Sequence, residues 1–306
     1  MTAGFREWTG RMSNWGRWGD DDQLGTINLI DERTRASAFA LVTVGRVFPL
    51  ALALDDRGPQ LSDSSRSNLI HIMKRTGEWP AEPGGFMYMD DIVMLHTHAS
   101  TQIDALSHVA YDGLLYNGVP ASSVTDAGAA SLGVETLGGG IVGRGVLLDL
   151  ARHLGVDMLE ASHVITSSQI EDCLDAQGVA LTAGDSLLIR TGWIRHFVNH
   201  DDREAYMSTE PGIGIEAAVW LKDRDVAFVA SDNWAIEVVP SVSPGETMPV
   251  HCLLVRDAGM PLGEMFNLEE LAIACAGRQN WEFLFACSVL PITGGVGAPV
   301  APLAIL

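Results

Sequence analysis

Residues 98–108 read His98-Ala99-Ser100-Thr101-Gln102-Ile103-Asp104-Ala105-Leu106-Ser107-His108. Three of these side chains, those of His98, Asp104 and His108, can bind a metal or move a proton near neutral pH. Gln102 adds a neutral carbonyl oxygen, and Thr101 lies beside it. A divalent ion beside a histidine that does not bind it can activate a water molecule, so the segment predicts a metal site.

The spacing of these residues requires an irregular backbone. A continuous strand over 98–108 would spread the side chains across roughly 33 Å. On a helix, residues 98 and 102 would share a face that 104 and 108 do not. Residues 91–95 read as a strand, so we expect a bend at 99–101, followed by a short helix over 105–110 that Asp104 caps. The bend would let the chain fold around one ion, whose ligand bonds are only about 2.0–2.2 Å long.

Two further candidates, His251 and Glu264, lie far downstream. One histidine is usually a satisfied core or surface residue, but His96, His98 and His108 fall within thirteen positions of a chain that has nine histidines. His96 would share a strand face with His98, and we interpret it as a supporting or surface residue.

The amino-acid composition indicates a folded protein and argues against some classes of partner. The chain has 306 residues, of which 47% are hydrophobic and 19% charged, which is typical of a folded protein of one large domain or two smaller ones. We found no linker or repeat and expect one domain over 1–306. The formal net charge of −20 argues against nucleic acid or an anionic membrane as a partner, because both need basic surface.

The four cysteines fit no zinc-finger spacing, and several lie in apolar runs, so we expect reduced core residues of a cytoplasmic protein. The N-terminal run 1–8 lacks the apolar core of a signal peptide. The apolar stretches end well short of about 18 residues, so no transmembrane helix is expected.

Short apolar runs alternate with helical patterns in the second half of the chain. Strands are expected at 145–150, 185–192, 226–232 and 281–290. Helices are expected at 166–174, where hydroxyl residues could cap the start, at 215–221, and at 267–272 with Asn267 as the cap. This alternation predicts an α/β fold with a central mixed sheet flanked by helices.

The segment 98–108 resembles the metal motif of the cyclase family, which includes bacterial kynurenine formamidases and isatin hydrolase. The family pattern is His-x-Gly-Thr-His-x-Asp-x-x-x-His. The later His–Glu pair of the family looks like His251 and Glu264, and residues 291–300 resemble its closing strand and glycine loop. Residues 14–19, 115–118 and 231–234 are similar to a branch described only as cyclases. The resemblance implies a swivelling β/β/α fold.

Transferred position by position, the resemblance implies two sets of metal ligands. The first motif and Glu264 would hold one ion. Asp104, His251 and Glu264 would hold a second ion or share the first one. The first set comprises His98, Gln102, Asp104 and Glu264. Gln102 stands where the family has its second histidine, and Ser100 replaces the glycine. An amide oxygen suits a harder ion better than imidazole does, so Mn²⁺ competes with Zn²⁺ as the expected cofactor, with one or two ions.

The implied activity is metal-dependent hydrolysis of an amide, imide, N-formyl or lactone bond in a small, aromatic or cyclic molecule. His108, kept off the metal, would be the general acid and base. Trp15 and Trp18 could line a flat substrate pocket, although ordinary packing explains tryptophans equally well. The resemblance also implies a homodimer or homotetramer.

Three other functions stay open at the level of sequence. A serine or cysteine nucleophile has little support, because no Gly-x-Ser-x-Gly run occurs. A metal-poor binding protein, in which Gln102 marks a lost site, is the second alternative. A lyase or true cyclase that uses the same metal to stabilise an enolate is the third.

Overall fold

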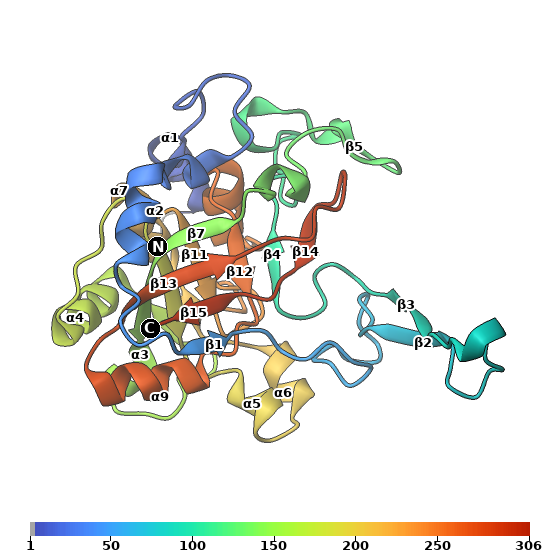
Figure 1. Ribbon diagram of the computed structural model, residues 1–306. Coiled ribbons are helices and arrows are strands. Elements are labelled where there is room, and N and C mark those ends of the chain that lie inside the picture. The colour runs from blue at the N-terminus through green and yellow to red at the C-terminus, as the bar shows by residue number, and fades with distance from the viewer. Residues whose placement is uncertain (1–3) are drawn as a thin grey trace.

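The apolar runs of the second half of the chain pair side by side in one large, curled sheet (Figure 1). The computed structural model describes residues 4–306, and nine of its strands within that range form this main sheet, in the order β1-β15-β13-β7-β9-β11-β12-β4-β14. The neighbours from β7 to β12 are parallel, and the other pairs are antiparallel. The expected mixed α/β sheet with flanking helices is confirmed.

The strands of the main sheet are β1 (Val47–Pro49), β4 (Gln102–Asp104), β7 (Ile141–Asp149), β9 (Ser186–Arg190), β11 (Phe228–Ser231), β12 (Leu262–Glu264), β13 (Glu282–Cys287), β14 (Gly297–Pro299) and β15 (Leu303–Ile305). The strands expected around 145–150, 185–192, 226–232 and 281–290 are confirmed as β7, β9, β11 and β13. Their apolar side chains supply much of the core, because a strand covered on both faces buries every residue.

Helices cover this sheet. They are α1 (Thr9–Met12), α2 (Glu32–Phe39), α3 (Leu150–His153), α4 (Ser167–Gln177), α5 (Arg195–Val198), α6 (Arg203–Ser208), α7 (Ile215–Asp223), α8 (Pro249–His251), the π-helix η7 (Cys252–Ala258) and α9 (Glu269–Arg278). Short 3₁₀ turns occupy Phe5–Glu7, Gly25–Leu29, Pro83–Gly85, Tyr116–Gly118, Ala121–Ser123 and Val134–Leu137. Helix α2 packs on β7 and β13, while α4 packs on α7 and β7.

The three expected helices are present, with one correction. Thr166 caps α4 through a capping box with Gln169, as its hydroxyl predicted. Helix α7 begins at Ile215 as expected. Asn267 does not cap α9: the N-cap residue is Leu268, and the Asn267 side chain only accepts a 3.4 Å hydrogen bond from the Glu269 N–H.

The chain between 98 and 108 bends where expected but continues differently. Residues 97–101 form turns and bends. The predicted helix at 105–110 is wrong, since these residues form turns, and Asp104 ends strand β4 instead of capping a helix. Long-range pairing decides the outcome: β4 lies between β12 and β14, and both neighbours fix its extended backbone.

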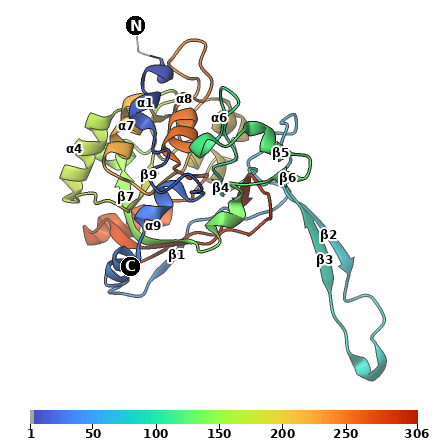
Figure 2. The ribbon, with the colours of Figure 1, turned by 90° about the horizontal axis from the view of Figure 1, so that it is seen from above.

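The remaining strands form small two-stranded sheets. These are β2 (Ile70–Arg75) with β3 (Asp90–Met94), β5 (Val124–Thr125) with β6 (Gly128–Ala129), and β8 (Val164–Ile165) with β10 (Gly212–Ile213). The strand expected at 91–95 is confirmed as β3. The β2–β3 hairpin projects away from the body of the molecule, as Figure 2 shows most clearly.

The cysteines agree with the expectation of a reduced core. Within residues 4–306, Cys173, Cys252, Cys275 and Cys287 are all buried and unbonded. Burial raises the pKa of each thiol to about 12, which makes them poor nucleophiles. No helix among the described residues is both long and apolar enough to cross a bilayer. Residues 1–3, where the N-terminal run of the sequence analysis begins, lie outside the described residues.

Candidate metal centre

Strand β4 carries the centre of the candidate site. Successive side chains of a strand point to opposite faces, so Gln102 and Asp104 share one face while Ile103 points into the core on the other. Glu264 of β12 lies directly opposite Gln102. On the other side of β4, Gly297 of β14 lies opposite Asp104. The sheet therefore places an amide and two carboxylates side by side in its interior.

The bend before β4 brings His98 close to Asp104. Its backbone is fixed by side chains from a preceding segment: Arg66 donates to the His98 carbonyl at 3.1 Å, and Gln60 donates to the Ala99 carbonyl at 3.0 Å. The buried Thr101 hydroxyl donates to the Met265 carbonyl at 2.6 Å and accepts from the Leu52 N–H at 2.8 Å. Thr101 thus joins the bend to the residue after Glu264.

Gly297 leaves the space that the His98 ring occupies. A Cβ atom on residue 297 would lie 2.2 Å from His98 Nε2, far inside van der Waals contact. The absence of a side chain at this position therefore lets the imidazole enter the sheet beside Asp104. The glycine loop expected at 291–300 has this definite structural role.

Two overlapping groups of side chains have the spacing of metal ligands. His98, Asp104 and His108 form one group, and Asp104, His251 and Glu264 form the other; within each group the ligand atoms lie within 4.8 Å of one another. The second group is the second set that the resemblance implied. Asp104 belongs to both, with Oδ1 3.4 Å from His98 Nε2 and Oδ2 3.7 Å from His251 Nε2. The two groups share Asp104 and could hold one ion or two.

The polar atoms of this cluster fit a cation. Among residues 4–306, His98 Nε2, Gln102 Oε1 and Asp104 Oδ1 are buried and have no hydrogen-bond partner. A buried polar atom without a partner costs about 1–3 kcal/mol, and an uncompensated buried charge costs more. All three atoms can offer a lone pair to a divalent cation. Nitrogen and oxygen ligands of this kind suit Zn²⁺ or Mn²⁺.

Glu237 is a site residue that the sequence analysis did not identify. Its Oε1 lies 2.5 Å from His251 Nδ1 and accepts the His251 backbone N–H at 2.9 Å, while Oε2 accepts the Val250 N–H at 3.1 Å. A carboxylate on Nδ1 fixes the ring so that Nε2 faces Asp104 and Glu264, as in carboxylate–histidine–metal arrangements. Glu237 lies three residues after 231–234, which the resemblance singled out, and that proximity was the available signal.

The electrostatic surroundings of the two buried histidines differ. Burial lowers the pKa of His98 to about 4, even though Asp104 acts in the opposite direction, so its ring is neutral and can act as a ligand near pH 7. Burial also disfavours a charged His251, but its hydrogen bonds to Glu237 and Glu264 outweigh that effect and raise its pKa. A cation between Asp104 and Glu264 would replace the proton that these carboxylates attract.

His108 is the most accessible titratable residue of the two groups. Its ring stacks on that of His98 with centroids 4.1 Å apart and an interplanar angle of 21°. His98, Asp104, His251 and Glu264 are buried, whereas His108 is half-buried. The structure therefore brings His108 within ligand distance of Asp104 and also gives it access to the outside of the cluster.

Gln102 has two distinct contacts available at the site. Its Nε2 donates to Glu264 Oε2 at 2.5 Å, which holds that carboxylate in place. Its Oε1 is one of the unpartnered buried atoms. The amide that replaces the second histidine of the family motif can thus orient Glu264 with one atom and offer a ligand with the other.

Trp15 and Trp18, the predicted substrate-binding residues, contact two arginines. The Trp15 indole donates to the Arg256 carbonyl of η7 at 2.9 Å, and the Arg256 guanidinium lies 4.3 Å from its ring. Trp18 packs under Arg17 at 4.7 Å. Trp15 supports the π-helix that follows His251, and π-helices often occur at functional sites. A substrate-lining role for either ring stays a prediction.

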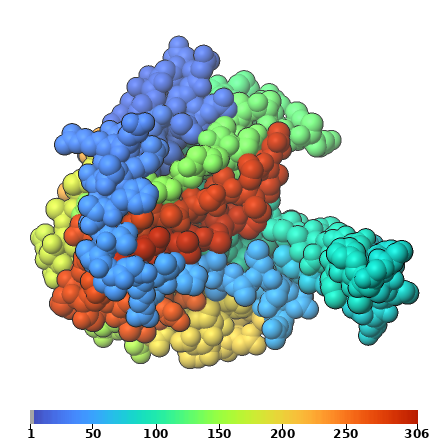
Figure 3. Space-filling view, in the orientation of Figure 1, coloured from blue at the N-terminus to red at the C-terminus, as the bar shows by residue number. Residues whose placement is uncertain are grey.

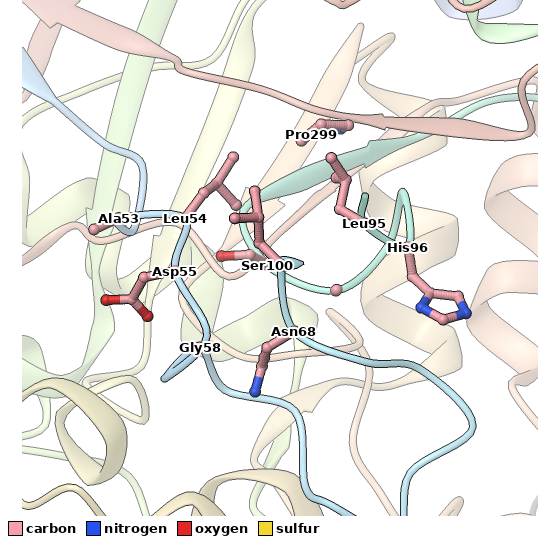
Figure 4. Close-up of a pocket in the computed structure, with 11 residues that line it drawn as sticks. Ala53, Leu54, Asp55, Gly58, Asn68, Leu95, His96, Ser100 and Pro299 are labelled. Carbon is pink, nitrogen blue, oxygen red and sulfur yellow. The ribbon is translucent and has the colours of Figure 1, made fainter. Parts of the chain in front are cut away.

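His96 is a surface residue. Its exposed Nδ1 accepts the Ser67 N–H at 2.9 Å. Figure 4 shows the ring directed away from Ser100, at one side of a small cavity of about 10 Å³ next to the bend. The cavity has space for little more than one water. His96 thus anchors the outside of the bend and does not join the cluster.

Comparisons with known proteins give matches to one family. Residues 48–238 match the Cyclase family model, described as "Putative cyclase". A crystal structure of a novel cyclase is 37% identical, covers 96% of this chain and 99% of its own, and superposes with a TM-score of 0.89. A search of curated protein sequences returned no match.

More distant structures share the fold. An isatin hydrolase bound to the product analogue thioisatinate is 17% identical over 90% of this chain and 99% of its own, with a TM-score of 0.64. A potential metal-dependent hydrolase with cyclase activity is 17% identical over 85% of this chain and 98% of its own, with a TM-score of 0.54.

Proposed function

Because the chain belongs to the cyclase family, we propose that it is a metal-dependent hydrolase that cleaves a C–N or lactone bond of a small molecule. The bond would be that of an amide, imide, N-formyl group or lactone, in an aromatic or cyclic substrate. The names of the isatin hydrolase and the metal-dependent hydrolase that share the fold support this class.

One observation carries the proposal: His98 Nε2 and Asp104 Oδ1, both buried and without a hydrogen bond to any described residue, lie 3.4 Å apart in a cluster that also holds His251 and Glu264. Without a cation, the sheet would hold several carboxylates and lone pairs at considerable cost. The donor set therefore favours a bound divalent ion and a catalytic use of the site.

The chain supplies the remaining parts of the reaction. A bound divalent ion would lower the pKa of water toward about 7 and polarise the substrate carbonyl. His108 would accept a proton from the attacking water and return it to the leaving nitrogen or oxygen. Its partial exposure suits that exchange, and the stacked His98 ring fixes its position. Glu237 would hold His251 in the orientation of a ligand.

The ligand set favours Mn²⁺ or Zn²⁺, and the amide oxygen of Gln102 moves the preference toward Mn²⁺. Asp104 has one oxygen near His98 and the other near His251, so two ions could share it. His98, Gln102, Asp104, His251 and Glu264 are the proposed ligands.

A substrate screen tests the activity. Purified protein loaded with Mn²⁺ or Zn²⁺ would be incubated with cyclic amides, imides, lactones and N-acyl aromatics, with product masses recorded. We expect a product that has gained one water. A product of unchanged mass would assign a cyclase or lyase instead. Tight metal binding without turnover of any of these classes would contradict the proposed hydrolase.

A further inference from the structure

Helices α4 and α7 begin next to each other, each directly after a short strand. Strand β8 leads into α4 and β10 leads into α7; the two strands pair in parallel, and the Gly214 N–H donates to the Ile165 carbonyl at 3.1 Å. A pocket of about 600 Å³ lies where the two helices begin. This volume is typical of a small-molecule site. The pocket is separate from the candidate metal centre, because none of the five proposed ligands lines it.

The first turn of α7 borders this pocket with its backbone. Gly214, Ile215, Glu216 and Ala217, which are the N-cap and the first three residues of the helix, all line it. The first N–H groups of a helix have no partner within the helix, and here the N-cap residue has no side chain that could accept from them. Helix α4 differs, because the Thr166 hydroxyl caps it. The start of α7 is therefore left with free donors.

Packing explains why residue 214 is a glycine. A Cβ atom at this position would lie 2.8 Å from Val164 Cγ1, so a capping serine, threonine or aspartate does not fit unless β8 moves. An uncapped helix N-terminus favours negative charge, and its N–H groups can bind a carboxylate. The close contact between residues 164 and 214 thus keeps this end of α7 open to an anionic group.

Ser243 is a second and independent feature that indicates a ligand. It lines the same pocket, it is only 4% exposed, and its Oγ has no hydrogen-bond partner among residues 4–306. Buried hydroxyl groups nearly always have a partner, because an unpaired one is costly. A hydroxyl group can donate to a carboxylate. The carboxylate of a bound molecule would therefore satisfy Ser243 and the start of α7 together.

The other residues of the pocket indicate the remaining properties of the ligand. Trp8 and Val242 line it, so an apolar group can pack there, and an aromatic one can stack on the indole. Trp8 is the N-cap residue of α1, which packs on α7, and the dark-blue N-terminal segment lies at the top of the molecule in Figure 3. Of the described residues that line the pocket, Glu216 alone is charged, and it is exposed. Its carboxylate repels a simple anion and attracts a cationic group.

We propose that this pocket binds a small zwitterion, namely an α-amino acid with an apolar or aromatic side chain. The carboxylate of the amino acid accepts from the free N–H groups of α7 and from the Ser243 hydroxyl. Its ammonium group pairs with Glu216, and its side chain packs against Trp8 and Val242. Both charges of such a ligand meet an opposite charge or dipole. A simple carboxylate leaves Glu216 opposed, and a simple amine leaves the helix N-terminus opposed.

Matched probes test the two charges. The metal-loaded full-length protein would be titrated with L-phenylalanine, L-leucine, phenylpropionate, which lacks the ammonium group, and phenylethylamine, which lacks the carboxylate. We expect the amino acids to bind, and each of the two truncated probes to bind at least about 10-fold more weakly than L-phenylalanine, as a lost charged hydrogen bond implies. Absence of saturable binding by both amino acids would overturn the proposal. Phenylpropionate or phenylethylamine binding as tightly as L-phenylalanine would also overturn it.

Variants locate the bound amino acid, since its carboxylate and amine could also reach a metal ion. Val242→Trp places a large side chain in the pocket and should abolish binding of L-phenylalanine. Val156→Trp is the matched control, because Val156 is 45% exposed, close to the 47% of Val242, and lies outside the pocket. It should bind L-phenylalanine as wild type does, and circular dichroism checks that both variants keep their fold. Undiminished binding in Val242→Trp would place the amino acid elsewhere and contradict the proposal.

Glu216→Gln separates the ammonium contact from the carboxylate contact. It should weaken the binding of L-phenylalanine by about 10-fold or more, because the charged partner of the ammonium group is lost. It should not weaken the binding of phenylpropionate, which no longer faces a like charge. The preference for L-phenylalanine over phenylpropionate should therefore shrink or vanish. A preference as large as that of wild type would show that Glu216 does not hold the ligand, and would refute the zwitterion assignment.

Discussion

Glu237 Oε1 lies 2.5 Å from Nδ1 of His251, and both residues are buried. The same carboxylate accepts the backbone N–H groups of Val250 and His251, so it holds both the ring and the start of the helix that carries it. The ring nitrogen left free, Nε2, faces Glu264 at 3.2 Å. The orientation of one proposed ligand thus depends on a residue that does not reach the metal cluster itself.

This relationship makes Glu237→Gln a sharp test of the site. The amide has one accepting oxygen in place of two and no negative charge, so it cannot hold the His251 ring and the Val250 N–H as the carboxylate does. We expect metal affinity to fall by about 10–100-fold, the usual effect of losing such a supporting carboxylate. Metal titration of the apoprotein measures it, and Glu216→Gln, which alters an exposed glutamate on α7, is the control. Unchanged affinity in a folded Glu237→Gln protein would show that Glu237 only caps the helix.

Variants of Gln102 test whether this residue shifts the metal preference from Zn²⁺ toward Mn²⁺. Gln102→His should still bind metal but prefer Zn²⁺ more strongly, because imidazole suits that ion better than an amide oxygen does. Gln102→Leu loses both the ligand and the hydrogen bond to Glu264, so its metal affinity should fall by about 10-fold or more. Titrations with Mn²⁺ and Zn²⁺ decide this. Identical affinities in wild type and both variants would remove Gln102 from the ligand set.

Gly297 makes a steric prediction. In Gly297→Ala the new methyl group would collide with His98 Nε2, so the ring must move away from Asp104. We expect weaker metal binding and a loss of about 1–3 kcal/mol of unfolding free energy, the cost of overpacking a core. Gly277→Ala is the control: it lies in α9 with open space around it and should be neutral or stabilising by about 0.4–1 kcal/mol. Equal behaviour of the two variants in thermal unfolding and metal titration would refute this reading of the loop.

His108→Ala tests the division of roles. Its metal content should stay near that of wild type, while turnover of an identified substrate falls by about 10²–10⁴-fold, because a general acid and base has been lost. His153→Ala, which removes an exposed histidine of α3, should change neither quantity. Elemental analysis together with steady-state kinetics separates the cases. Loss of metal from His108→Ala would reassign His108 as a ligand, a role that its distance to His98 and Asp104 also permits.

Local patterns predicted much of the fold. Strands β7, β9, β11 and β13 each contain a run of at least three consecutive apolar residues, and Thr166 and Gln169 carry the capping signal of α4 in their own spacing. Such features depend on neighbours in sequence, so they can be identified without knowing the tertiary structure.

Features decided by distant partners could not be predicted in this way. Residues 102–104 are a strand because β12 and β14 lie on either side of them, not because of their own propensity. Glu237 reaches His251 across fourteen positions with no periodic pattern, and Gly297 matters only because His98 packs against it. The apolar residues of β2 and β3 gave no sign that these strands would project from the body of the molecule.

The central claim is that Asp104 and its neighbours bind a divalent cation, and the metal stoichiometry of Asp104→Asn tests it most directly. Apoprotein prepared by prolonged chelation would be titrated with Mn²⁺ and Zn²⁺ by calorimetry, beside Asp112→Asn as a control at an exposed aspartate. We predict one or two ions per chain in wild type and in the control, recovery of activity with the ion, and no tight binding in Asp104→Asn. Wild-type protein that binds no ion, or that is fully active when verified to be metal-free, would contradict the account.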